Sequence, residues 1–147
     1  MIRAVLDANV WVSAVLNPLG TPAQLYALWH AGRYDVLMSA AILAEMTRVL
    51  RYPKIATRHA WSDAQHQAFL EDIMALALST PGTLALTVIA DDPSDNRYLE
   101  CAVEGDTGFL VTGDRLLLDL GTYEGIVILT PRAFLERLQA STPTEDR

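Results

Sequence analysis

The sequence predicts an α/β fold of three layers, in which helices cover both faces of a parallel five-stranded sheet. Short runs of β-branched and aliphatic residues recur along the chain, and segments with helix-capping signals separate them. Such alternation forms βαβ units, whose right-handed crossovers bring the carboxyl ends of the strands to one edge. The 147 residues suit one domain. We expect this domain to span residues 1–139, followed by a flexible tail at 140–147.

The first strand is predicted within Ile2–Asn9, where an apolar run ends at Asp7. Short apolar or alternating runs predict the other four strands, which are residues 35–38, 83–90, 109–112 and 126–129.

Helices are predicted where a capping residue precedes an amphipathic segment. Thr21-Pro22 and Thr130-Pro131 each place an N-cap before a proline at the first helical position. The predicted helices are residues 22–30, 40–50, 63–78, 95–103 and 131–138, with a short helical turn at 116–120. Residues 11–16 are compatible with a short helix or a turn, and the basic segment 52–60 is predicted to be irregular.

Composition restricts the location and the partners of the protein. The single cysteine, Cys101, excludes an internal disulfide and suits a reducing cytosol. We see no signal peptide, and no apolar run approaches the ~18 residues of a membrane helix. The net charge of −7 argues against nucleic acid, but Arg48, Arg51, Lys54 and Arg58 gather in one stretch. The charge therefore lowers the expectation of nucleic-acid binding without removing it.

Acidic residues are predicted to converge at the carboxyl edge of the sheet. Asp7 ends the first strand, Asp95 begins the helix after the third, and Asp114 follows the fourth. Glu45 lies in the helix after the second strand, from which a longer side chain reaches the same edge. All-oxygen ligands of this kind favour Mg²⁺ or Mn²⁺. A zinc site is disfavoured, because no His or Cys lies near these positions in the sequence. Such sites fit metal-assisted phosphoryl transfer.

Each acidic residue also has an ordinary structural interpretation. An aspartate at the end of a strand often caps the next turn or helix, and Ser94-Asp95 resembles such a cap. Most helical glutamates, such as Glu45, simply face water. Four such residues on one predicted edge are harder to explain as caps.

An ordered series of motifs resembles the PIN-domain family, and most closely its VapC-like toxins of toxin–antitoxin modules. The matching segments are Leu6-Asp7-Ala8-Asn9-Val10, Ser39-Ala40-Ala41-Ile42-Leu43-Ala44-Glu45, Asp92-Pro93-Ser94-Asp95-Asn96-Arg97-Tyr98-Leu99-Glu100-Cys101-Ala102, Phe109-Leu110-Val111-Thr112-Gly113-Asp114 and Ile128-Leu129-Thr130-Pro131-Arg132-Ala133-Phe134-Leu135. The resemblance implies a Mg²⁺- or Mn²⁺-dependent endoribonuclease whose catalytic and metal-binding residues are Asp7, Glu45, Asp95 and Asp114.

The resemblance also implies supporting residues around these acids. Thr112 matches a hydroxyl residue that supports the fourth acid, and Asp92 would assist Asp95. Asn9 stands where the family often has Thr or Ser. Possible RNA contacts are Arg48, Arg51, Lys54, Arg58, Arg97 and Arg115.

By the same resemblance, the protein would dimerise and bind a cognate antitoxin as part of a type II module. One alternative is a non-catalytic PIN-like module that binds RNA or the antitoxin. Another is a phosphatase-like hydrolase with Asp7 as nucleophile. That chemistry usually needs a second acid two residues later, where this chain has Asn9.

Overall fold

The computed structural model describes residues 1–141 and has the predicted three-layer α/β architecture. In this part of the chain the sheet has six strands rather than the predicted five, namely β1 (Arg3–Leu6), β2 (Asp35–Met38), β3 (Leu78–Ser79), β4 (Phe109–Val111), β5 (Thr122–Tyr123) and β6 (Ile126–Leu129). Their order is β3-β2-β1-β4-β6-β5, and β5 alone among them pairs antiparallel. Strand β1 is therefore an interior strand with parallel neighbours on both sides.

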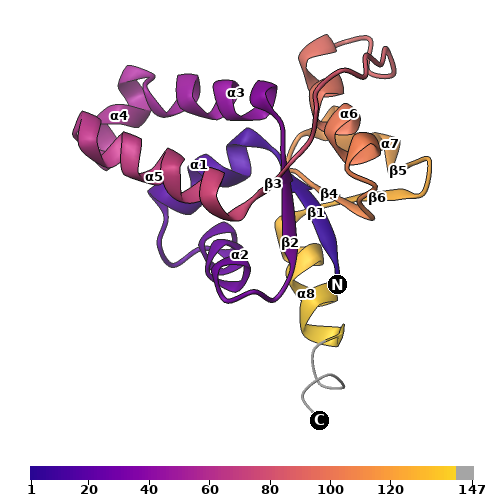
Figure 1. Cartoon of the computed structure of the whole chain (residues 1–147), viewed down its shortest axis with the longest axis horizontal. Coiled ribbons are helices and arrows are strands. Elements are labelled where there is room, and N and C mark those ends of the chain that lie inside the picture. The colour runs from indigo at the N-terminus through magenta and orange to yellow at the C-terminus, as the bar shows by residue number, and fades with distance from the viewer. Residues whose placement is uncertain (142–147) are drawn as a thin grey trace.

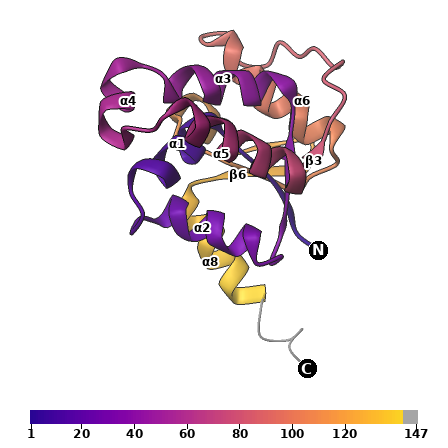
Figure 2. The same cartoon turned by 60° about the vertical axis from the view of Figure 1, so that its left-hand side comes forward.

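Helices cover both faces of this sheet (Figures 1 and 2). They are α1 (Ala8–Leu16), α2 (Thr21–His30), α3 (Ala40–Leu50), α4 (Pro53–His59), α5 (Asp63–Leu76), α6 (Asn96–Glu104), α7 (Arg115–Leu120) and α8 (Pro131–Ser141), with a 3₁₀ turn, η1, at Pro93–Asp95. Helices α6 and α7 lie on one side of the sheet, and α1, α2 and α8 lie on the other (Figure 1). None of the described helices is long and apolar enough to cross a membrane.

The last helix extends three residues beyond its predicted end at residue 138. Residues 140 and 141 belong to α8, whereas the rest of the predicted tail, 142–147, lies outside the described residues.

Segment 52–60, predicted to be irregular, contains helix α4. Pro53 begins this helix, and Ala60 ends it in a left-handed conformation with φ of 55°. Seven residues are too few for a helix that is stable by itself, so its formation depends on packing. The imidazole of His59 supplies one such tie, because its two nitrogens bond the Leu50 carbonyl (2.8 Å) and the Trp61 N–H (2.9 Å).

The predicted strand at 83–90 was wrong. Helix α5 ends at Leu76, and the third strand is the short β3. Residues 80–90, called the strap below, run on outside the sheet. Leu84, Leu86 and Val88 of the strap are half-buried and alternate with exposed residues, which explains the strand-like pattern. The Thr80 N–H still donates to the Met38 carbonyl of β2 at 3.0 Å. Beyond it, backbone N–H groups from Thr83 to Val88 bind side chains of α6 instead of another strand.

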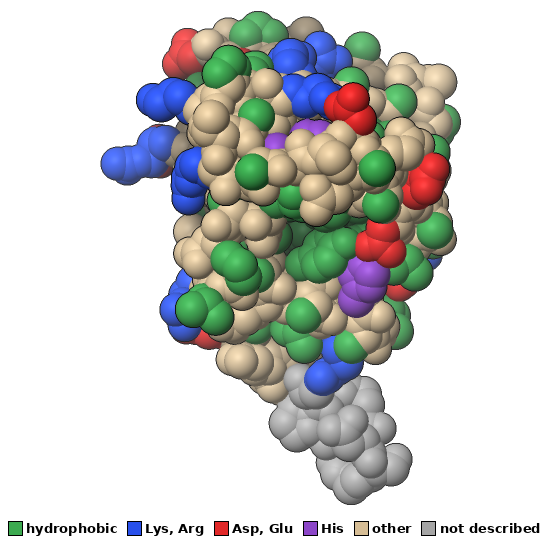
Figure 3. Space-filling view, turned by 90° about the vertical axis from the view of Figure 1, so that its left-hand side faces the viewer, with side chains coloured by type: hydrophobic (Ala, Val, Ile, Leu, Met, Phe, Trp, Pro, Cys, Tyr) green, Lys and Arg blue, Asp and Glu red, His purple; other side chains and the backbone are tan. Residues whose placement is uncertain are grey.

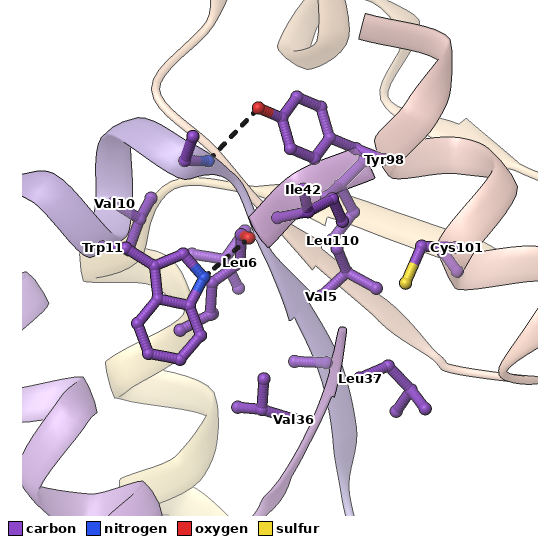
Figure 4. Close-up of a cluster of buried hydrophobic side chains, with 14 of the residues drawn as sticks. Val5, Leu6, Val10, Trp11, Val36, Leu37, Ile42, Tyr98, Cys101 and Leu110 are labelled. Atoms are coloured by element: carbon purple, nitrogen blue, oxygen red, sulfur yellow. Dashed lines mark hydrogen bonds between the residues drawn. The ribbon is translucent and has the colours of Figure 1, made fainter. Parts of the chain in front are cut away.

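Buried side chains from both sides of the sheet pack around the end of β1 (Figure 4). On one side, Trp11 of α1 donates its Nε1–H to the Leu6 carbonyl at 3.1 Å. On the other, the Tyr98 hydroxyl of α6 accepts the Ala8 N–H at 3.3 Å. The two residues that flank Asp7 are thus held by buried aromatic side chains from opposite layers.

Candidate metal centre

The pairing of β1 with β4 places Asp7 beside Thr112. Leu6 is in register with Val111, and the Asp7 N–H continues the pairing by donating to the Val111 carbonyl at 3.1 Å. The Thr112 hydroxyl donates to Asp7 Oδ2, and Val10 N–H donates to Asp7 Oδ1 at 2.9 Å. Both carboxylate oxygens of this buried aspartate therefore have donors. Burial raises the pKa of Asp7 against the lowering effect of these bonds.

Asp114 is positioned by the same threonine. Its backbone N–H donates to Thr112 Oγ1 at 2.9 Å, and its Oδ1 caps α7 by accepting the Leu116 N–H at 2.8 Å. The capping interpretation is therefore correct for Asp7 and Asp114, each of which caps a helix with one oxygen. Each carboxylate keeps acceptor capacity beyond its cap, because a carboxylate can accept about four hydrogen bonds.

Three of the acidic side chains form one group. Carboxylate oxygens of Asp92, Asp95 and Asp114 lie within 4.8 Å of one another. Asp95 is buried, and the other two are half-buried. Asp92, predicted to assist, is a full member of this group, whereas Asp7 and Glu45 are not.

Asp95 carries the strongest electrostatic conflict of the group. Its side chain makes no capping bond to α6, and its buried Oδ2 has no hydrogen-bond partner among the described residues. Burial, followed by the charges of Asp114 and Asp92, raises the pKa of Asp95 to about 7. A buried carboxylate oxygen without a donor is costly in a folded protein. A cation placed among these oxygens would remove that cost.

Asn96 holds the loop that carries Asp92 and Asp95. Its Oδ1 accepts the N–H groups of Val88 (3.0 Å) and Ile89 (2.9 Å). Its Nδ2 donates to the carbonyls of Ile89 (3.1 Å) and Pro93 (3.0 Å). The amide thus uses both donors and both acceptor positions in a buried setting. Asn96 thus ties the end of the strap to the start of α6 and holds the short segment between them, which carries both aspartates.

Glu45 lies at the margin of this site. It is half-buried, and Arg48 donates to its Oε1 one helical turn away. Burial and then the charges of Asp7, Glu45 and Asp95 raise the pKa of the Tyr98 phenol, so Glu45 and these aspartates act on the same buried hydroxyl. Sequence reasoning did not select Tyr98 or Asn96. Tyr98 follows Asp95 by three residues and so shares its helix face. That spacing is the sequence signal by which Tyr98 could have been found.

Other predicted residues lie at the surface. Asn9, Arg97 and Arg115 are exposed. Arg51 pairs with Asp63 at 3.2 Å, and both of these side chains are exposed. Such exposed pairs hold a side chain weakly.

The donor set fits a divalent cation of the Mg²⁺ or Mn²⁺ type. Asp92, Asp95 and Asp114 offer carboxylate oxygens only, which these ions prefer over nitrogen or sulfur. The buried Oδ2 of Asp95, which has no hydrogen-bond donor among the described residues, also suits a cation as its partner.

We predict that Asp95→Asn stabilises the metal-free protein at pH 8. A carboxyl whose pKa is raised by folding binds its proton more tightly in the folded state. The stability that this proton contributes is present below the ordinary pKa of 3.8, is lost as pH rises through about 7, and changes little above that pH. Thermal unfolding in EDTA between pH 5 and pH 8 should show this fall in the wild type and a smaller one in the variant. Asp91→Asn, at an exposed neighbour, is the control. Equal pH slopes for wild type and Asp95→Asn would contradict the assignment.

We predict that Asn96→Ala weakens Mn²⁺ binding about 10- to 100-fold, as is typical when support for a metal ligand is lost. Glu104→Ala is the matched control, because Glu104 binds the N–H groups of Gly82, Thr83 and Leu84 at the far end of the strap. Isothermal titration calorimetry should find the Mn²⁺ affinity of the Glu104→Ala variant unchanged. If both variants lose affinity alike, general loosening of the strap is responsible and Asn96 has no specific part.

Comparison with known proteins places this geometry in a family. A family model described as PIN domain matches residues 3–116. The uncharacterized protein MJ1680 of Methanocaldococcus jannaschii is 23% identical over 94% of this chain and 92% of its own length. PAE2754 from Pyrobaculum aerophilum has a similar fold, with a TM-score of 0.57 and 21% identity over 95% of this chain and 91% of that chain.

A second solved structure also shares the fold. It is a chain from VapBC2 of Rickettsia felis, bound to a DNA fragment from its promoter, with a TM-score of 0.57 and 14% identity over 88% of this chain and 98% of that chain. The family match covers most of the chain, including β1, β4 and all the aspartates of the site. This chain therefore belongs to the PIN-domain family.

Proposed function

We propose that the protein is a Mg²⁺- or Mn²⁺-dependent endoribonuclease that acts as the toxin of a type II toxin–antitoxin module. The observation that carries this proposal is the buried carboxylate oxygen of Asp95, which lacks a partner within a group of three aspartates. PIN domains are generally nucleases, and the choice of RNA rests on the resemblance of the ordered motifs to VapC-like ribonucleases.

Asp92, Asp95 and Asp114 would hold the cation, with Asp7 and Glu45 completing the acidic surroundings. When bound, the ion would lower the pKa of the attacking water and offset charge on the leaving oxygen. Thr112 keeps Asp7 and Asp114 in fixed positions, because its hydroxyl bonds both residues. Asn9 would orient water at the opening of the site, where it is exposed.

The basic side chains at the surface would bind the phosphates that flank the scissile bond. Arg97 and Arg115 each adjoin or nearly adjoin a metal-binding aspartate in sequence, and both are exposed. Arg48, Arg51, Lys54 and Arg58 extend this surface along α3 and α4. Their charge allows an acidic protein to approach RNA on one side.

The partner proposals follow from the kind of module. VapBC2 of Rickettsia felis shares the fold, and its name joins two components. We propose that this chain likewise binds a cognate antitoxin and forms a homodimer. A toxin that cleaves cellular RNA would act in the cytoplasm, which the buried, unpaired Cys101 suits.

We predict that Asp95→Asn lowers RNA cleavage by at least about 100-fold, the scale expected when a main electrostatic group of an active site is removed. Asp7→Asn should lose activity as well, whereas Asp91→Asn should cleave like wild type. The assay follows cleavage of a structured RNA with Mg²⁺, with Mn²⁺ and with EDTA.

Cleavage that persists in EDTA, or full activity of Asp95→Asn and Asp7→Asn, would refute metal-dependent catalysis at this site. Binding of RNA or antitoxin without any cleavage would favour the alternative, a non-catalytic PIN-like module.

A further inference from the structure

One region of this acidic protein is strongly basic. Between Glu45 and Asp63 the chain has no acidic residue, although its net charge is −7. The same interval contains Arg48, Arg51, Lys54 and Arg58 and includes the end of α3 and all of α4. Lys and Arg side chains gather over the upper part of the face shown in Figure 3. A ligand of this region is therefore expected to be anionic.

The basic region contains an open cavity of 570 Å³ at the start of α4, lined by Tyr52, Pro53, Lys54, Ile55 and Arg58. The cavity combines an aromatic ring and apolar carbons with two cations. Tyr52 leaves 45% of its surface exposed and is the one aromatic among the exposed large hydrophobic residues of the described chain. Aromatic rings beside cations are the typical platform for bases of single-stranded nucleic acid.

Two contacts of Arg48 connect this cavity with Glu45, at the margin of the metal centre. Arg48 donates through Nη2 to Glu45 and through Nε to the Tyr52 hydroxyl at 3.4 Å. Tyr52 follows Glu45 by seven positions, of which the helical part, from Glu45 to the end of α3 at Leu50, rises about 8 Å. Arg48 therefore lies between the margin of the acidic site and the exposed ring.

We propose that this cavity holds one unpaired nucleobase of an RNA strand, stacked on Tyr52, while a nearby phosphate of the strand lies at the metal centre. Lys54 and Arg58 would bind the phosphates on either side of that base. This inference rests on the proposed ribonuclease function. A hydrophobic peptide would use the ring and Ile55 but would leave the two cations without a partner, so the lining favours a nucleotide.

We predict that Tyr52→Ala weakens binding of a single-stranded RNA oligonucleotide about 10- to 100-fold, the range expected for one lost base stack. Tyr52→Phe keeps the ring and should bind like wild type. Leu19→Ala is the control for loss of an exposed apolar side chain, since Leu19 is 90% exposed and not part of the cavity lining. Fluorescence anisotropy in an Asp95→Asn background measures binding without cleavage.

An abasic scan of the same oligonucleotide identifies the base. In the protein that keeps Tyr52, one abasic position should lower RNA affinity as much as the Tyr52→Ala substitution does. In the Tyr52→Ala variant, the same abasic position should lower RNA affinity no further. Unchanged binding by Tyr52→Ala, equal effects at every abasic position, or no RNA binding at all would overturn the proposal. Competition by an apolar peptide but not by RNA would overturn it in favour of a peptide site.

The two proposals can fail separately. If the Tyr52 and abasic effects coincide but wild type does not cleave RNA, the base site stands and the nuclease assignment fails. If wild type cleaves RNA and Tyr52→Ala binds normally, only the base site fails.

Discussion

The parallel pairing of β1 with β4 is the constraint on which the site depends. It brings the ends of two strands together, so that Thr112 of one bonds Asp7 of the other and also fixes Asp114. Carboxylates this close repel one another, and neutral donors reduce the cost without cancelling the charge. The remaining conflict falls on Asp95, which has a raised pKa and a buried oxygen with no donor in the described chain. A fold that keeps such a conflict is adapted to a positive partner.

The acidic residues are supported in two different ways. Asp7 and Asp114 stand at strand ends and cap helices, so the sheet itself positions them. Asp92 and Asp95 lie on the loop and turn that follow the strap, which is fastened to α6 by the side chains of Asn96, Glu100 and Glu104. These three residues are spaced by four and thus share one face of the helix. Asp92 and Asp95 are therefore positioned through side-chain hydrogen bonds, whereas Asp7 and Asp114 are positioned through the backbone pairing of the sheet.

The sequence predicted the fold class correctly, but it did not predict how the chain reaches Asp92 and Asp95. Strand ends and capping signals are local, so the closeness of Asp7 and Asp114 could be predicted from topology. Asp95 was assigned to the same edge through a strand at 83–90 that does not form. The strap was mistaken for a strand because a period-two pattern reports which side chains are half-buried and not what the backbone binds. Helix α4 was missed because its stability comes from contacts such as that of His59, which no local pattern reveals. The closeness of Asp92 to Asp114 likewise depends on the tertiary path of the loop.

The central claim is that the three aspartates form a divalent-metal site, and a crystal soaked in Mn²⁺ tests it most directly. We predict an anomalous scattering peak among the carboxylates of Asp92, Asp95 and Asp114, with Asp95 Oδ2 as a ligand. No peak there at saturating Mn²⁺, or a peak whose ligands exclude Asp95, would contradict the account.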